Sequence, residues 1–276
     1  MSQSFQQLAI DVGNSRIKFV LLETDLQVKE NKQLPHVLNT CSTLIEKPLP
    51  WKQIQSWFDG PSAMKCQTVV AGSNPRGIEG VVGNWPDGTL PTPVEILNTD
   101  DFPLEICVEE PRKVGIDRLL NAVAANRLQN TGQAAIIIDS GTATTVDVVN
   151  PDGSFAGGTI LPGFELSAKA LYHYTALLPL IPVDELRQVE PVVLGKNTTD
   201  AIRSGLFWGQ LGAVRELVSQ LTKQSLADSS QVDPLVLLTG GGSDLLAPHL
   251  EGSVQFEPLL TLQGLAIVAQ KMNGAG

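Results

Sequence analysis

The chain alternates short apolar runs with stretches in which apolar residues recur at helical spacing, a pattern typical of a mixed α/β protein. The short runs predict strands at residues 8–12, 18–23, 68–71 and 235–239. The helical spacing predicts helices at residues 51–58, 116–128, 165–176, 199–223 and 260–272. Residues 179–191 carry prolines and acids without such a period, so they predict an ordered loop.

One predicted strand, at residues 135–139, ends its apolar run in an acid. Three isoleucines precede Asp139, and the residues from 140 to 145 are all small or hydroxylated. A second strand through Val149, a turn at residues 150–153 and a third strand at 154–160 follow. The sequence therefore predicts a three-stranded meander whose first turn is built from small residues.

This acid and its turn have a counterpart in the first half of the chain. Residues 10–15, IDVGNS, and residues 138–143, IDSGTA, share one plan: an apolar strand, an Asp, a Gly turn, a hydroxyl and a returning strand. The likeness predicts two similar domains, each of which presents an Asp-Gly turn to a shared cleft. Because the likeness is short, a chance similarity between the two segments is the alternative to duplication.

The two turns suggest a phosphate site. Gly and Ser or Thr leave backbone N–H groups open to an anion, whereas Asp repels a phosphate unless a cation lies between them. The pattern thus indicates a nucleotide whose charge is carried on Mg²⁺ or a similar ion. A single Asp-x-Gly is more often an ordinary turn, but two copies on matching strands favour the site. Neither a P-loop nor a GxGxxG pattern after a strand is present. The glycines at 240–242 suit either an approaching adenosine or a plain strand-to-helix turn.

The second candidate site is the sequence GIDR, at residues 115–118, where a helix is predicted to begin. In a first helical turn both Asp117 and Arg118 can point into a cleft. Asp117 could then accept a hydroxyl proton, and Arg118 could bind a substrate carboxylate in bidentate fashion. The alternative is a helix-start acid beside a solvated arginine.

Composition narrows the class of protein. Hydrophobic residues make up 42% and charged residues 17%, which is typical of a globular chain. The formal charge is −10 and only 19 Lys and Arg are spread along the chain, so no nucleic-acid footprint is expected. The three cysteines have no CxxC spacing, which indicates a reducing compartment rather than a disulfide or zinc framework. No signal segment or long apolar run is present, so we expect no membrane partner and a cytoplasmic location.

Four separated motifs resemble the type III pantothenate kinases of the acetate and sugar kinase, heat-shock chaperone and actin superfamily. They are DVGNSRIK from residue 11, GIDR from 115, DSGTATTVD from 139 and GGTILPG from 157, and a later NTTDAI begins at 197. They occur in family order and span most of the chain. The resemblance implies an α/β protein of two ribonuclease H-like (actin-like ATPase) domains, residues 1–114 and 115–276. Mixed sheets flanked by helices and an active site in the interdomain cleft would follow.

The resemblance also implies an activity, the ATP-dependent phosphorylation of pantothenate to 4′-phosphopantothenate, the first step of coenzyme A biosynthesis. Asp117 would be the general base. The implied ATP-binding residues are Asp11, Val12, Gly13, Asn14, Ser15, Arg16, Ile17, Lys18 and Thr142. The implied pantothenate-binding residues are Gly115, Ile116, Asp117, Arg118 and Thr198.

Cations and a second subunit are implied as well. Asp11 would act on the Mg²⁺ of ATP, and Asp139 would bind a monovalent cation, K⁺ or NH₄⁺. Family members are homodimers with a shared site, in which Thr198 would reach the pantothenate of the partner subunit. His173 lies where some members place a second contact with the partner. The apolar helix near residues 207 and 208 would suit an interface.

Two positions depart from the family pattern, and two other functions compete. Ser15 replaces a usual Thr and keeps the hydroxyl, whereas Val108 stands where some members have a Tyr that bonds the substrate. One competing function is a kinase of the same superfamily that acts on another small hydroxylated substrate. The other is a non-catalytic relative that serves as a transcription accessory factor. The chain keeps all four polar residues expected of an active enzyme: Asp11, Asp117, Arg118 and Asp139.

Overall fold

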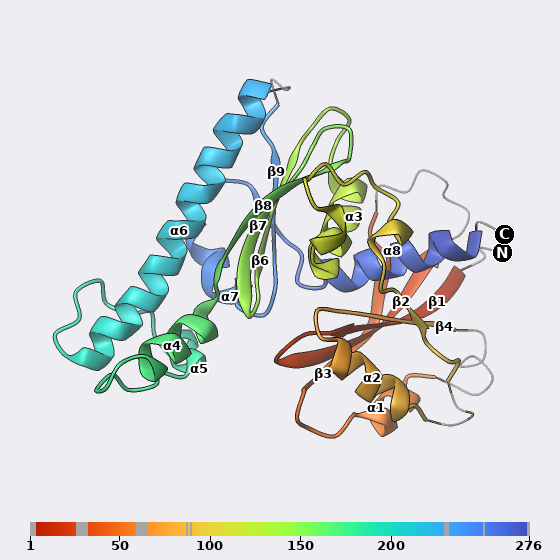
Figure 1. Ribbon diagram of the computed structural model, residues 1–276, viewed down its shortest axis with the longest axis horizontal. Helices are drawn as coiled ribbons and strands as arrows, with labels where there is room; N and C mark the ends of the chain where they lie inside the picture. Colours follow the sequence, from red (N-terminus) through yellow and green to blue (C-terminus); the bar gives the residue numbers. More distant parts are fainter. Residues whose placement is uncertain are drawn as a thin grey trace. The chain divides into compact units, whose positions relative to one another are not determined.

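The computed structural model describes residues 4–25, 33–58, 66–86, 88, 90–228, 232–250 and 252–274, and its internal contacts divide the chain into two units (Figure 1). Unit 1 takes the described residues of 1–128 and 259–276, and unit 2 takes those of 129–258. The sequence predicts a boundary after residue 114, whereas the contacts group the helix at 116–128 with the first sheet. Asp117 therefore belongs to the same unit as Asp11.

Unit 1 is built on a five-stranded mixed sheet in the order β3-β2-β1-β4-β5. Its strands are β1 (Ser4–Val12), β2 (Arg16–Asp25), β3 (His36–Leu44), β4 (Gln67–Ala71) and β5 (Val94–Glu95). The β1–β2 and β2–β3 pairs are antiparallel, and the β1–β4 and β4–β5 pairs are parallel. The central strand β1 is buried on both faces, which explains its continuous apolar run at residues 8–10.

The helices of unit 1 are α1 (Trp51–Gln55), α2 (Pro75–Gly83), α3 (Ile116–Leu128) and α8 (Leu260–Gly274), with short 3₁₀ turns at Thr99–Asp101 and Pro111–Lys113. Asn74 caps α2, because its side chain accepts a hydrogen bond from the Gly77 N–H at 3.0 Å and Pro75 follows it. The helices α3 and α8 lie in contact, and α8 packs against β1. The predicted helix at 116–128 is confirmed, and the one at 51–58 ends at Gln55.

Unit 2 repeats this sheet. Its strand order is β10-β9-β6-β7-β8, from β6 (Ala135–Ser140), β7 (Ala143–Val149), β8 (Phe155–Pro162), β9 (Leu235–Thr239) and β10 (Val254–Phe256). The β6–β7 and β7–β8 pairs are antiparallel, and the β6–β9 and β9–β10 pairs are parallel. Read from β8 to β10, this sheet has the same order of strands and the same strand directions as the sheet of unit 1. The two units thus repeat the ribonuclease H-like plan. The predicted meander and the predicted pair of similar domains are confirmed.

The helices of unit 2 are α4 (Phe164–His173), α5 (Val183–Gln188), α6 (Thr198–Asp228) and α7 (Ser243–Leu246), followed by a 3₁₀ turn at Ala247–His249. The long helix α6 covers one face of the sheet (Figure 1), and its residues Leu206, Leu211 and Val214 join the core around Ile138. Phe207 is also part of this core and is only 2% exposed. Phe207 itself therefore offers almost no surface to a partner, whereas the neighbouring Trp208 is partly exposed, so the expected interface at this helix stays a prediction.

The segment predicted as a loop at 179–191 contains helix α5. Leu186 of this helix is 2% exposed and belongs to the core of unit 2, so tertiary packing supports a helix too short to be stable alone. Within the described residues, no helix is both long enough and apolar enough to cross a bilayer. All three cysteines are free thiols.

Candidate functional site

The β1–β2 turn forms the first corner of the candidate site. Gly13 closes the turn by donating its N–H to the Arg16 carbonyl at 3.0 Å. The strand register places Lys18 directly opposite Asp11 on one face of the sheet, and both side chains are partly buried. The Asn14 amide donates to the Ser73 hydroxyl at 3.4 Å. The expected ATP-binding residues 11–18 therefore surround one tight turn, whereas Thr142 lies at the β6–β7 turn of unit 2.

The end of β4 lies against this corner, which the sequence did not reveal. A Cβ built at Gly72 would lie 2.2 Å from the Val12 carbonyl oxygen, and the φ of Gly72 is +150°. Asn74 donates its N–H to the same Val12 oxygen at 3.2 Å. The signal that could have found this support is the Gly-Ser-Asn-Pro run directly after a buried strand. A side chain at position 72 would push the strand end away from the turn.

The β6–β7 turn forms an equivalent corner in unit 2. Gly141 donates to the Ala143 carbonyl at 3.0 Å, and Thr145 lies opposite Asp139 in the register. The end of β9 packs on this corner through the glycine turn, which we define as residues 240–242. Gly242 donates its N–H to the Ser140 carbonyl at 2.8 Å. This bond matches the one from Asn74 to Val12, so the duplication extends from the strands to the two corners.

The position of the Asp139 carboxylate explains why residue 240 is a glycine. A Cβ at this position would lie 2.4 Å from the Asp139 carboxylate oxygen Oδ1, and the φ of Gly240 is +94°. The carboxylate thus occupies the volume that a side chain at residue 240 would need. Asp139 is only partly buried, so one carboxylate can serve a bound cation here without losing all contact with solvent.

The motif GGTILPG supports the same corner. Gly163 donates its N–H to the Thr142 carbonyl at 3.0 Å, and a Cβ on Gly163 would lie 2.3 Å from the Gly141 oxygen. A Cβ on Gly158 would lie 2.3 Å from Oδ1 of Asp147. Asp147 is fully buried and accepts the Thr145 hydroxyl at 2.9 Å. These glycines therefore allow β8 and its following turn to lie close to the strand that carries the hydroxyls.

The GIDR motif begins helix α3, as expected. The Asp117 side chain folds back over Gly115, where a Cβ would lie 2.6 Å from Oδ1. The same Oδ1 accepts the Arg118 N–H at 2.9 Å. Within the described part of the chain this is the only hydrogen bond of the carboxylate, so its second oxygen remains available to a ligand. Asp117 and Arg118 are both partly exposed.

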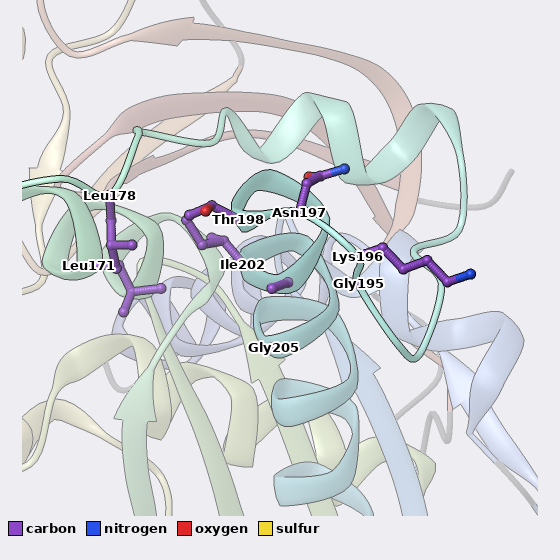
Figure 2. A pocket seen from close by; sticks show the side chains of 9 residues that line it. Leu171, Leu178, Gly195, Lys196, Asn197, Thr198, Ile202 and Gly205 are labelled. Atoms are coloured by element: carbon purple, nitrogen blue, oxygen red, sulfur yellow. The ribbon is translucent and has the colours of Figure 1, made fainter.

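Thr198 is placed in a separate pocket at the start of α6 (Figure 2). The pocket has a volume of about 540 Å³, and Leu171 and Leu178 line it opposite Asn197 and Lys196. Asn197 caps the helix, because its Oδ1 accepts the Asp200 N–H at 2.9 Å and its amide donates to the Asp200 carboxylate at 2.7 Å. The cap fixes the first turn of α6 and with it the position of Thr198.

In the described part of the chain, the residues expected to bind cations do not form a preassembled metal centre. Among the described residues, no group of three or more His, Cys, Asp or Glu side chains could hold a metal ion. A single carboxylate at each corner nevertheless fits Mg²⁺ or K⁺ that arrives with a nucleotide, because phosphate oxygens and water complete the coordination of such ions. The corners around Asp11 and Asp139 therefore fit substrate-borne cations rather than a structural metal.

Comparison with known proteins decides the family. The family model for type III pantothenate kinase matches residues 7–220. This chain belongs to that family. A type III pantothenate kinase from Ruegeria sp. is 31% identical over 271 residues, which cover 98% of both chains. Another from Syntrophotalea carbinolica is 39% identical over 171 residues, which cover 62% of this chain and 63% of that protein.

With several other type III pantothenate kinases, including the one from Syntrophotalea carbinolica, the chain spans only about three fifths of the relative's length. Among solved structures, a Baf family transcriptional activator from Campylobacter jejuni is similar, with a TM-score of 0.57 and 17% identity. The likeness covers 97% of this chain and 99% of that one, and it supports the fold alone.

Proposed function

We propose that the protein is a pantothenate kinase that transfers the γ-phosphoryl group of ATP to pantothenate and forms 4′-phosphopantothenate. One observation carries the proposal. In a chain of the type III family, both duplicated corners keep their acid, and the acid of the GIDR motif keeps an oxygen available. A relative that had lost catalysis would have no reason to retain all three.

Each corner would contribute contacts to ATP. The turn from Asp11 to Lys18 and the exposed Thr142 offer backbone N–H groups, hydroxyls and one ammonium group to its phosphates. Asp11 would hold Mg²⁺ and Asp139 would hold K⁺ or NH₄⁺, and these ions would neutralise the charge of the phosphate chain. Lys18 would add a positive charge beside the transferring group, because it lies opposite Asp11 on the strand pair.

Asp117 would act as the general base. Its Oδ1 is held by the Arg118 N–H, so Oδ2 can take the proton of the primary hydroxyl as that oxygen attacks the γ-phosphorus. The guanidinium of Arg118 would bind the pantothenate carboxylate, with Gly115 and Ile116 beside it. Positioning of two reactants in line accounts for most of the rate in phosphoryl transfer.

A homodimer would complete the substrate site through Thr198. The segment between α4 and α6 exposes several large apolar side chains, and Leu177 is 91% exposed. The part of this segment that leads into α6 is held in place, because Trp208 donates to the Pro191 carbonyl at 2.9 Å and Ser204 donates to the Val193 carbonyl at 2.6 Å. Fixed apolar side chains on a surface favour a protein partner, here a second copy.

The free thiols agree with a cytoplasmic location.

The test is release of ADP with and without pantothenate, and with Na⁺ in place of K⁺. We expect release that requires pantothenate and falls when Na⁺ replaces K⁺. Asp117→Asn should lower turnover by about a hundred- to ten-thousand-fold, because a positioned base contributes that much. Asp100→Asn is the matched control, since Asp100 is an exposed acid of the same unit that pairs with Arg112.

Two outcomes would count against the proposal. Release of ADP that does not depend on pantothenate would support a kinase with another acceptor. Near-normal turnover of Asp117→Asn would remove Asp117 from the role of base while leaving the kinase activity itself in place.

A further inference from the structure

Arg187 of α5 connects three parts of unit 2 through one guanidinium group. Its Nε donates to Asp244 Oδ2 at 2.8 Å, and its Nη2 donates to Asp244 Oδ1 at 3.3 Å. Nη1 donates to Asp184 at 2.7 Å. Nη2 also donates to the carbonyl oxygen of Gly241 at 2.7 Å. The bidentate pair with Asp244 fixes the plane of the guanidinium, so the contact with Gly241 has a defined direction.

Gly241 is the centre of the glycine turn, and both of its neighbours touch the corner that carries Asp139. Gly240 lies against the Asp139 carboxylate, and Gly242 donates to the Ser140 carbonyl at 2.8 Å. Three consecutive glycines have little conformational preference of their own, so contacts from outside must define their path. Arg187 supplies such a contact from a helix 54 positions away in the sequence.

Helix α5, which carries Arg187, is itself fixed by contacts with the rest of unit 2. Leu186 anchors it in the core, and Glu185 forms an ion pair with Arg203 of α6. Arg203 also lies 3.4 Å from the Asp200 carboxylate. The hydrogen bond to Asp244 and the charge of that carboxylate raise the pKa of Arg187, so the guanidinium is charged at neutral pH. The helix is therefore tied both to the sheet core and to α6.

We propose that Arg187 is a positioning residue that holds the glycine turn against Asp139 and thereby sets the affinity of the unit 2 corner for the nucleotide. This inference rests on the proposed function, because it requires that the corner binds ATP. Arg187 would act through Gly241 and would not touch the reacting groups.

The test measures binding of the magnesium complex of a non-hydrolysable ATP analogue to the 276-residue chain by calorimetry in KCl. We expect Arg187→Gln and Asp244→Asn each to weaken binding by about tenfold, because each removes charge-assisted hydrogen bonds that fix the turn. Arg187→Lys should also weaken it, since an ammonium group cannot keep both the bidentate pair and the carbonyl contact. Asp184→Asn is the matched control and should change binding by less than about twofold, because it removes an exposed contact that does not lead to the turn.

Thermal unfolding and steady-state kinetics separate positioning from stability. A positioning role raises the KM for ATP and leaves the KM for pantothenate near that of the wild type. A merely structural role lowers the melting temperature of Arg187→Gln while leaving the dissociation constant unchanged, and this result would overturn the inference. If Arg187→Gln fails to fold, Asp244→Asn decides, because it keeps the arginine in place. A wild-type protein that binds no nucleotide would overturn the kinase proposal as well, whereas wild-type binding with unaffected variants overturns the role of Arg187 alone.

Discussion

Gly240 and Gly241 are neighbours in the glycine turn, yet their surroundings differ. A Cβ at residue 240 would lie 2.4 Å from Asp139 Oδ1, and its φ of +94° is strained for any other residue. A Cβ at residue 241 would meet no atom within 4 Å. We expect Gly240→Ala to lower the free energy of unfolding by about 1–3 kcal/mol, and Gly241→Ala to leave it nearly unchanged. Urea unfolding of the two variants measures the difference, and equal losses would contradict this account.

The cysteines offer a test of burial that depends on pH. Burial raises the pKa of the Cys66 thiol to about 12, and burial also raises the pKa of Cys41. Because the thiolate is the reactive form, Cys66 stays protonated and reacts slowly in the folded protein at pH 8. Cys107 is exposed. At pH 8 we expect a thiol reagent to label Cys107 first, and to label Cys66 only after denaturant is added. Rapid labelling of Cys66 without denaturant, mapped by mass spectrometry, would contradict the placement of β4.

Single residues of the candidate site were visible in the sequence when they broke a local pattern. Asp11 and Asp139 stand out because an acid at the end of an apolar strand has no reason to be there for packing. Arg187 and Gly72 were missed, because nothing adjacent to them in the sequence marks their role. Each acts through a contact with a segment far along the chain, and such contacts follow only from the fold.

At the scale of elements, the sequence predicted those helices and strands whose apolar pattern is strong. The helix at 116–128 and the strand at 235–239 agree with the structure at both ends. The strand β3 was missed, because most of its residues are exposed and its sequence lacks a clear alternation. The helix α5 was missed because it is short and depends on the burial of Leu186. Edge strands and short helices are thus stabilised by tertiary contacts that local patterns do not encode.

The contact between α3 and α8 depends on a helical glycine. A Cβ at Gly264 would lie 2.0 Å from the Leu120 carbonyl oxygen, a backbone atom that cannot move freely. Gly264→Ala should therefore cost about 1–3 kcal/mol of stability through overpacking. The matched control is Gly209→Ala in α6, where a Cβ would meet no atom within 4 Å. Ala should stabilise that helix by about 0.5–1 kcal/mol. Thermal unfolding that gave both variants the same sign would show that the two helices do not pack as described.

At the scale of the whole molecule, duplication explains why Asp11 and Asp139, far apart in the sequence, have equivalent surroundings in their two units. The sheets of both units have the same order, and in each unit a backbone N–H after the fourth strand of the repeat binds the carbonyl next to the acid. The substrate side has no such repeat. GIDR occurs once, at the start of α3, and Thr198 starts α6 in the other unit. Nucleotide binding would therefore use what the units share, and acceptor binding what distinguishes them.

Association with a second copy of the chain can be tested by mutation of the exposed apolar segment. If the exposed apolar segment between α4 and α6 forms the dimer, Leu177→Ser should shift the protein toward monomers, because Leu177 is 91% exposed in a single chain. Leu97→Ser is the matched control, since Leu97 is 51% exposed in unit 1 and should leave the dimer intact. Light scattering after size-exclusion chromatography measures the mass. A wild-type monomer at micromolar concentration would contradict the dimer and the sharing of Thr198.

Sharing of the site between subunits predicts that two inactive variants can restore each other. In a mixed dimer of Asp117→Asn and Thr198→Ala chains, one site would combine an intact Asp117 with an intact Thr198 from the neighbouring chain, and the other site would lack both. Random exchange of equal amounts makes about half of the dimers mixed, so activity should recover to about a quarter of the wild-type value. If Thr198 served the pantothenate site of its own chain, every site in the mixture would lack one group and no activity would return. Turnover measured before and after subunit exchange therefore distinguishes a shared site from a site within one chain.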